Sequence, residues 1–494
     1  MRSVAPSAFG VPASAQPVWL QHGWALLAVV VSLLCAMATM ATKTLWVLPV
    51  LAALPVAILI AFRVPFALLL AFVAFSFFRL HEAFPALLAL RIPILLALGV
   101  IGVLAWKVLV VRTIKPRWTL ELALLAALFV HVTFGVAFAS NRSLALDAWT
   151  GTYGKIILIT FALVWLARTR DHLLAFNAVL LTCGAVIACV TLHNAALGIG
   201  LVEGTRVTIG RDIGSVLGDP NDLALVLLFP LGFASAMLTL SPRVGVRIVA
   251  GIVLALLVAA LIETQSRGGL LGMLAVLGVA GYWRTRSPAF AITALFVCAV
   301  VLAALMGLET RQSGGAHEGG LDQSAQGRLL AWETALWMTL ANPITGVGLN
   351  NFIANYFDFV PVWEGKVYAV HSTWLKMLAE AGLPGLFIML TVIAVLTRRL
   401  LLCAAFDRRE ASGAACISAP NVRLADMRLA ARDREAIGVG FLAALAGFCV
   451  AGTFLTQAFT WPFYVLVALA SAYCTLSERP VAEPSRRLLP AARQ

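Results

Sequence analysis

Four residues in the second half of the chain are candidates for chemistry: Arg211, Arg267, Arg328 and His371. Arginine presents a planar fork of donors that matches phosphate oxygens and stays charged at any working pH, so several converging arginines suit a diphosphate. Histidine titrates near neutrality and can accept a proton from a hydroxyl group. A glycosyl donor with a diphosphate leaving group would use both side chains. The arginines would stabilise the departing diphosphate, and the histidine would activate the attacking oxygen.

Each position also has a purely structural interpretation. Arg267 can anchor a helix end at the lipid head groups, and a lone histidine such as His371 more often has a structural role than a catalytic one. Asn221 lies in a helix-start signal, where capping is expected. Asp219 and Asp222 flank that signal, which favours capping over metal binding, and we predict no metal site.

Gly346 and Gly348 are interpreted as turn glycines, because a glycine pair alone is a weak phosphate signal. Most of the eight cysteines lie inside apolar runs with no CxxC, so we read them as small buried side chains and predict no disulfide or cofactor. The net charge of +13 does not indicate nucleic acid, because the arginines lie between apolar segments and not on an aromatic-rich soluble face.

Composition places the chain in a membrane. It is 61% hydrophobic and 12% charged, whereas about a quarter of the residues of a soluble domain are charged. Apolar runs long enough to cross a bilayer predict an all-α, polytopic bundle of about 12–14 transmembrane helices. The predicted crossings lie near residues 24–41, 45–62, 65–80, 86–106, 119–139, 152–167, 173–192, 221–240, 244–262, 268–283, 289–308, 375–397, 438–455 and 461–476.

Lys and Arg concentrate on the cytoplasmic side of membrane proteins, and their distribution favours both chain ends inside. The four candidate residues then share the outer face, where a large loop spans 309–374. The predicted organisation is a cytoplasmic tail (1–23), N-terminal transmembrane helices (24–210), a core (211–397), a cytoplasmic Arg-rich loop read as a linker or short amphipathic helix (398–437), C-terminal transmembrane helices (438–476) and a cytoplasmic tail (477–494).

Four motifs in the core share an order and spacing with a known superfamily. They are Gln-Ser-Arg-Gly-Gly at 265–269, Gly-Arg with a following Trp at 327–332, Asn-Pro-Ile-Thr-Gly-Val-Gly-Leu-Asn-Asn-Phe at 342–352, and His371 followed by Glu-Ala-Gly-Leu-Pro-Gly-Leu at 380–386. Together they resemble the O-antigen ligase and polymerase superfamily over roughly 211–397. The resemblance implies a bundle of the lipid-linked-sugar glycosyltransferase class whose large periplasmic loop carries a short helical cap.

The resemblance also implies roles for single residues. Arg211 matches the outer-loop arginine that handles the donor diphosphate, and Arg267 a recurrent arginine of the next outer turn. Arg328 matches the second essential arginine, and His371 the essential histidine, a base or acceptor-positioning group. The family's histidine is commonly followed by Asn, whereas Ser372 stands here. Asn221, Gly346, Gly348 and Glu380 are expected to hold the loops.

The expected activity is that of a metal-independent membrane glycosyltransferase in the bacterial inner membrane, with its active site facing the periplasm. Such enzymes take the glycan from undecaprenyl diphosphate. The acceptor is lipid A-core for a ligase, which we place first, another lipid-linked glycan for an O-antigen or exopolysaccharide polymerase, and a protein hydroxyl for a protein O-oligosaccharyltransferase. A polysaccharide or lipid transporter is the alternative from another class, although its charged groups would be expected near mid-membrane.

Overall fold

In a computed structural model, the structure describes residues 62–290, five residues between 292 and 300, residues 323–413 and residues 424–478. The chain divides into two units, Met1–Pro65 and Phe66–Gln494, and the elements below belong to the second, except for Pro65, the first residue of α3. The crossings predicted near 24–41, 45–62 and 289–308 lie wholly or mostly outside the described residues, so the total number of crossings stays a prediction.

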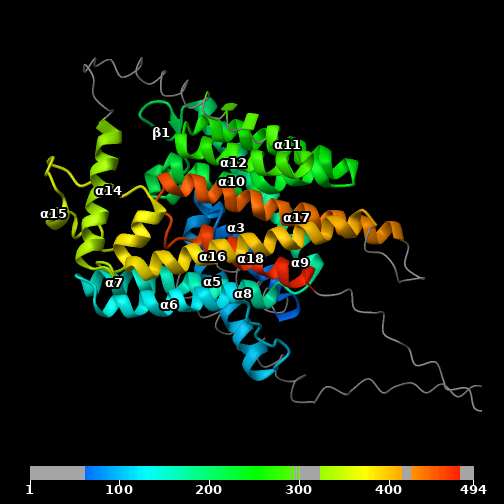
Figure 1. Cartoon of the computed structure of the whole chain (residues 1–494), viewed down its shortest axis with the longest axis horizontal. Coiled ribbons are helices and arrows are strands. Elements are labelled where there is room, and N and C mark those ends of the chain that lie inside the picture. The colour runs from blue at the N-terminus through cyan, green and yellow to red at the C-terminus, as the bar shows by residue number, and fades with distance from the viewer. Residues whose placement is uncertain are drawn as a thin grey trace, which may run out of the picture. The chain divides into compact units, whose positions relative to one another are not determined.

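The described residues form helices and one short hairpin (Figure 1). The helices are α3 (Pro65–Ser76), α4 (Leu80–Ala83), α5 (Ile92–Ala105), α6 (Leu120–Ala137), α7 (Arg142–Ala148), α8 (Gly154–Leu166), α9 (Arg170–Leu197), α10 (Pro220–Leu240), α11 (Val244–Glu263), α12 (Arg267–Thr285), α14 (Gln323–Ala341), α15 (Tyr356–Phe359), α16 (Thr373–Ala411), α17 (Leu424–Ala451) and α18 (Trp461–Ser477). Strands β1 (Leu201–Val202) and β2 (Arg206–Val207) pair antiparallel. Among the described residues, eight helices are long and apolar enough to cross a membrane. The predicted all-α polytopic membrane fold is confirmed.

The centre of the bundle is built on α10 and α17. Most residues in the apolar stretches of α10 and α17 are buried by other parts of the protein. In α11, by contrast, fewer than a third of the residues in the apolar stretch are buried. Gly232 of α10 lies so close to α17 that a β-carbon there would come within 2.9 Å of the Ala444 nitrogen. Small residues allow such close backbone approach, which drives helix association in lipid. These two helices therefore form a rigid frame on which the polar loops rest.

Helix α16 contains a break that the sequence analysis did not foresee. The crossing predicted at 375–397 is one part of a 39-residue helix, interrupted at Gly382 with φ 69° and ψ −173°. A β-carbon at Gly382 would lie 2.4 Å from the Ile344 carbonyl oxygen. Only glycine adopts this conformation easily, and the break lets the loop after α14 pack directly on α16.

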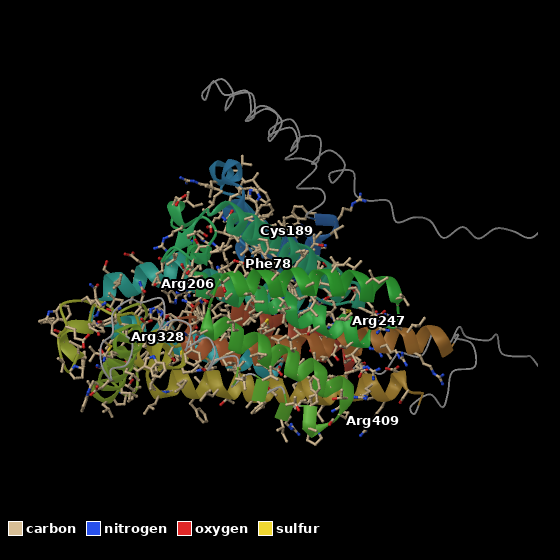
Figure 2. All side chains as sticks on the ribbon, turned by 90° about the horizontal axis from the view of Figure 1, so that it is seen from above. Phe78, Cys189, Arg206, Arg247, Arg328 and Arg409 are labelled. Atoms are coloured by element: carbon tan, nitrogen blue, oxygen red, sulfur yellow. The ribbon has the colours of Figure 1, made fainter. Side chains whose placement is uncertain are left out.

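Residues 398–411 and 424–437 are helical extensions of α16 and α17, where we expected a linker or short amphipathic helix. Buried ion pairs close this end of the bundle: Arg434 Nε lies 2.8 Å from Asp407 Oδ1, and Arg399 Nη1 lies 2.5 Å from Glu121 Oε2. Figure 2 shows Arg247 and Arg409 toward this end and Arg206 and Arg328 toward the other. Arginines therefore occupy both ends of the bundle, and only the latter end, called the site end below, carries candidate residues.

Candidate functional site

The start of α10 is the hub of the site end. Asp219 caps the helix, because its Oδ1 accepts the Asn221 N–H at 2.7 Å. The Asn221 side-chain oxygen accepts two hydrogen bonds, from Arg206 Nη2 at 2.9 Å and from Ser266 Oγ at 2.8 Å. Ser266 also caps α12 by accepting the Gly269 N–H. Asn221 thus joins the hairpin, α10 and α12 at one point.

Arg206 and Arg267 meet at this junction. Arg267 is the first residue of α12, after a turn in which Gln265 has a left-handed φ of 48°. Burial lowers the pKa of Arg206, and the nearby positive charge of Arg267 lowers it further, while Glu203 and Asp219 raise it. Two arginines with overlapping fields favour an anion between or beside them.

His371 lies close to both a positive and a negative charge. Its pKa is lowered below the usual value, first by burial and then by the charge of Arg328, while Asp219 acts in the opposite direction. The imidazole is therefore neutral at neutral pH and able to accept a proton. Its backbone has φ 40°, a left-handed conformation that costs a non-glycine residue roughly 1–2 kcal/mol. Strain of this kind persists only where the surroundings fix it.

Helix α14 brings Arg328 to His371. The indole N–H of Trp332 donates to the carbonyl oxygen of Val370 at 2.9 Å. A β-carbon at Gly327 would come within 2.2 Å of the Tyr368 ring, so glycine is needed for α14 to approach the chain before His371. The Gly-Arg…Trp spacing thus has a geometric meaning, because the residues on either side of Arg328 dock the helix.

Glu380 holds the glycine-rich turn after α14. Its buried carboxylate accepts the N–H of Asn350 at 2.8 Å and the N–H of Phe352 at 3.3 Å. Gly346 and Gly348 both have positive φ, and β-carbons there would collide with the α16 backbone near Ala379 and with Ala139, respectively. The turn is therefore fixed between α16 and the end of α6, and it supports α14.

Arg211 lies in a separate, exposed loop at the same end of α10. Its Nη1 donates to the carbonyl oxygen of Gly218 at 3.1 Å, one residue before the helix cap. Ser215 shapes this loop by accepting the Leu217 N–H and by hydrogen bonding to the carboxylate of Glu82. Glu82 is also held by Arg79 Nε at 2.6 Å. The structure joins Arg211 to the site through its loop, whereas Arg328 and His371 interact directly by charge.

A buried hydrogen-bond chain ties the α10 start to the segment after His371. Gln457 Nε2 donates to Asp222 Oδ1 at 2.5 Å, and the Gln457 backbone N–H donates to Thr373 Oγ1 at 3.1 Å. Thr373 in turn donates to the Leu455 carbonyl oxygen at 2.7 Å. The connection between α17 and α18 therefore fixes the distance between α10 and the first residue of α16.

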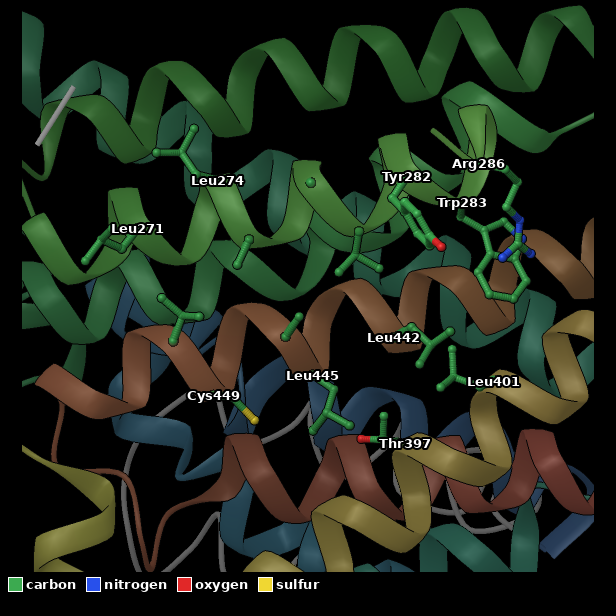
Figure 3. A pocket seen from close by; sticks show the side chains of 15 residues that line it. Leu271, Leu274, Tyr282, Trp283, Arg286, Thr397, Leu401, Leu442, Leu445 and Cys449 are labelled. Carbon is green, nitrogen blue, oxygen red and sulfur yellow. The ribbon is translucent and has the colours of Figure 1, made fainter. Parts of the chain in front are cut away.

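An apolar pocket of about 850 Å³ lies between α12, α16 and α17, away from His371 (Figure 3). It begins at Leu271, about one turn beyond Arg267 along α12. At its other end the Arg286 guanidinium stacks 3.9 Å above the Trp283 ring. The pocket therefore follows α12 for most of the length of that helix, and apolar side chains dominate its lining.

Within the described ranges, no group of three or more His, Cys, Asp or Glu side chains is placed to hold a metal ion. The comparisons with known proteins give one match, to the family model described as O-antigen ligase, over residues 252–390. This segment, called the O-antigen ligase domain below, is similar to that family. None of the curated proteins matches the chain. The resemblance to the O-antigen ligase and polymerase superfamily is confirmed, and the match supports membrane glycosyltransferase activity of this general type in a multi-pass membrane protein.

The O-antigen ligase domain contains most of the predicted site residues, but two of them precede it in the chain. Arg267, Arg328 and His371 lie inside it, with Gly346, Gly348 and Glu380, whereas Arg211 and Asn221 precede it. Sequence reasoning missed Arg206 and Gln457. Arg206 could have been noticed as a basic residue shortly before Arg211 on the same predicted face. Gln457 carries no sequence signal, because a single amide in a short connection is common.

Proposed function

We propose that this protein is an O-antigen ligase that transfers a glycan from undecaprenyl diphosphate to a hydroxyl group of lipid A-core, at the periplasmic face of the bacterial inner membrane. The observation that carries the proposal is that the positive charge of Arg328 lies near a buried His371 with left-handed backbone, inside the O-antigen ligase domain, and so favours the neutral imidazole. A base beside a cation is the arrangement that glycosyl transfer from a diphosphate needs.

In the proposed step, the acceptor hydroxyl oxygen forms a bond to the anomeric carbon of the donor sugar. The bond from that carbon to the diphosphate oxygen breaks, and its electron pair leaves with the diphosphate. His371 takes the hydroxyl proton, because its lowered pKa keeps the imidazole neutral before the reaction. Arg328 and Arg267 stabilise the charge that grows on the diphosphate, and Arg211 contacts it from the exposed loop.

The pocket along α12 supports a lipid-linked donor. A polyprenyl chain is apolar and flexible, and the pocket offers a long apolar lining that starts one turn from Arg267. A donor with its diphosphate at Arg267 would place its first isoprene units beside Leu271. In the reversed orientation, the diphosphate of the donor would lie at Arg286. The reacting sugar would then be at the end of the pocket that is far from His371.

The proposal is tested in a deletion strain complemented with wild type, Arg328→Ala or His371→Ala. A ligase predicts loss of long glycan from lipid A-core, with full-length chains accumulating on undecaprenyl diphosphate, and neither variant restores the glycan. If single repeats accumulate on the carrier instead, the acceptor is another glycan. If both variants complement fully, His371 and Arg328 have no catalytic role.

A further inference from the structure

Helix α14 carries an exposed apolar face that the site does not use. Leu329, Leu336, Trp337 and Leu340 are between 48% and 69% exposed. Leu336 follows Leu329 by seven residues, and Leu340 follows Leu336 by four and Trp337 by three. These separations place the four side chains on one side of the helix. Glu333 is the one charged residue on this side of α14. A soluble loop rarely leaves such a surface in water, so the face needs an apolar cover.

The other side of α14 is already occupied by protein. Ala331, Ala335 and Met338 are buried in a small core with Val347 and Tyr356. This core lies between α14, α15 and the start of α16, as Figure 1 shows for the helices. Helix α14 is therefore packed against the protein on one side. Its exposed apolar face lies on a different side of the same helix.

The apolar face of α14 continues toward the exposed apolar surface of α16, a helix long and apolar enough to cross a membrane. After α14 ends, Ile344 is 66% exposed, and the carbonyl oxygen of its neighbour Pro343 accepts the Leu383 N–H at 2.8 Å. Leu383 and Phe387 follow the break in α16, are exposed, and belong to a helix apolar enough to cross the bilayer. One apolar band thus runs from α16 across Ile344 to Leu340 and Trp337.

We propose that α14 rests on the lipid leaflet at the site end, with this face in contact with acyl chains. Tryptophan favours the membrane–water interface, and a helix with one apolar side lies in the interface plane. Contact with lipid would hold the helix from one side while Trp332 and Gly327 dock it from the other. Arg328 would then sit at a fixed depth relative to the lipid surface. The inference goes beyond the proposed function and does not rest on it.

The chain offers a matched pair of tryptophans for the test. Trp337 and Trp363 are about equally exposed, at 50% and 47%. Trp363 lies in a different exposed segment, after α15, together with Glu364 and Lys366, and its ring packs against that of Phe357. The full-length protein is reconstituted into nanodiscs of phospholipid with brominated acyl chains, as wild type, Trp337→Phe and Trp363→Phe. The emission of each tryptophan is the difference between wild type and its variant.

The proposal predicts that brominated acyl chains remove most of the Trp337 emission and leave the Trp363 emission unchanged. Acrylamide in the water phase should act in the opposite sense, quenching Trp363 more strongly. Equal lipid quenching of the two residues would overturn the proposal. Shielding of Trp337 from both quenchers would also overturn it, because it would mean that protein, such as a second copy of the chain, covers the face.

Discussion

The indole N–H of Trp332 donates to the carbonyl oxygen of Val370 at 2.9 Å, and this bond links the helix of Arg328 to the peptide that precedes His371. The two proposed catalytic side chains come from elements separated by about forty residues. Their relative position therefore depends on a few docking contacts, of which this bond is the most direct.

Replacement of Trp332 with Phe should reduce the transfer rate without unfolding the protein. The ring volume is largely kept, but a hydrogen bond worth about 0.5–1.5 kcal/mol is lost. We expect a fall in kcat/KM of roughly three- to tenfold, measured with purified enzyme in nanodiscs. Trp363→Phe is the control, because its indole is exposed and lies outside α14 and the site. Equal activity of both variants would contradict the docking role.

The acid limb of the pH–rate profile should follow the charges around His371. Protonation inactivates the proposed base, and burial and the charge of Arg328 keep the pKa of His371 below its usual value. Arg328→Gln removes a positive charge, so the pKa should rise and the limb should move to higher pH in the residual activity. Asp219→Asn removes a negative charge and retains a capping oxygen, so the limb should move to lower pH. Shifts in the same direction in both variants would exclude His371 as the titrating group.

Ser215 and Arg211 should be energetically coupled. Ser215→Ala breaks the link to Glu82 and loosens the loop from which Arg211 donates to Gly218. We expect a higher KM for the donor with little change in kcat. A double-mutant cycle with Arg211→Ala is the critical measurement. In the Arg211→Ala background the serine substitution should have no further effect, whereas additive losses would show that the loop acts independently of Arg211.

Glu380→Ala should destabilise the turn after α14. Two backbone N–H groups, of Asn350 and Phe352, would lose their acceptor. Phe352 is buried, and an unsatisfied buried donor costs about 1–3 kcal/mol, whereas Asn350 is exposed to water. We expect a lower midpoint of thermal unfolding in detergent and lower activity. Glu380→Gln keeps one side-chain oxygen and should fall between wild type and Ala. An unchanged midpoint for the alanine variant would contradict the supporting role.

Sequence reasoning reached the membrane class and the resemblance to the family, because apolar run length and motif order are local signals. It also named most of the polar residues discussed above at the site end, whose roles stay predictions. It missed the break at Gly382, since a glycine within an apolar run also suits an unbroken helix, and only the contact with Ile344 explains it. It missed the hydrogen bonds from Arg206 to Asn221 and from Gln457 to Asp222 because they join residues that only the packing of separate helices brings together.

The glutamate of the Arg79–Glu82 segment illustrates the same limit. The structure places the Glu82 carboxylate against Ser215, more than a hundred residues away, and no local pattern in the sequence predicts that contact. The long extensions of α16 and α17 were also missed, since their arginines read as surface charges. In the structure, Arg434 pairs with Asp407 in a buried network beyond the apolar span of these helices.

The most direct test of the central claim is transfer with purified components. Wild-type protein, Arg328→Ala and His371→Ala are incubated with undecaprenyl-diphosphate-linked glycan and lipid A-core, without added metal or nucleotide sugar, and glycosylated lipid A-core is measured by mass spectrometry. The account predicts product and released undecaprenyl diphosphate with wild type and a loss of both with either variant. Full product formation by His371→Ala, or transfer by wild type only to a second lipid-linked glycan, would contradict it.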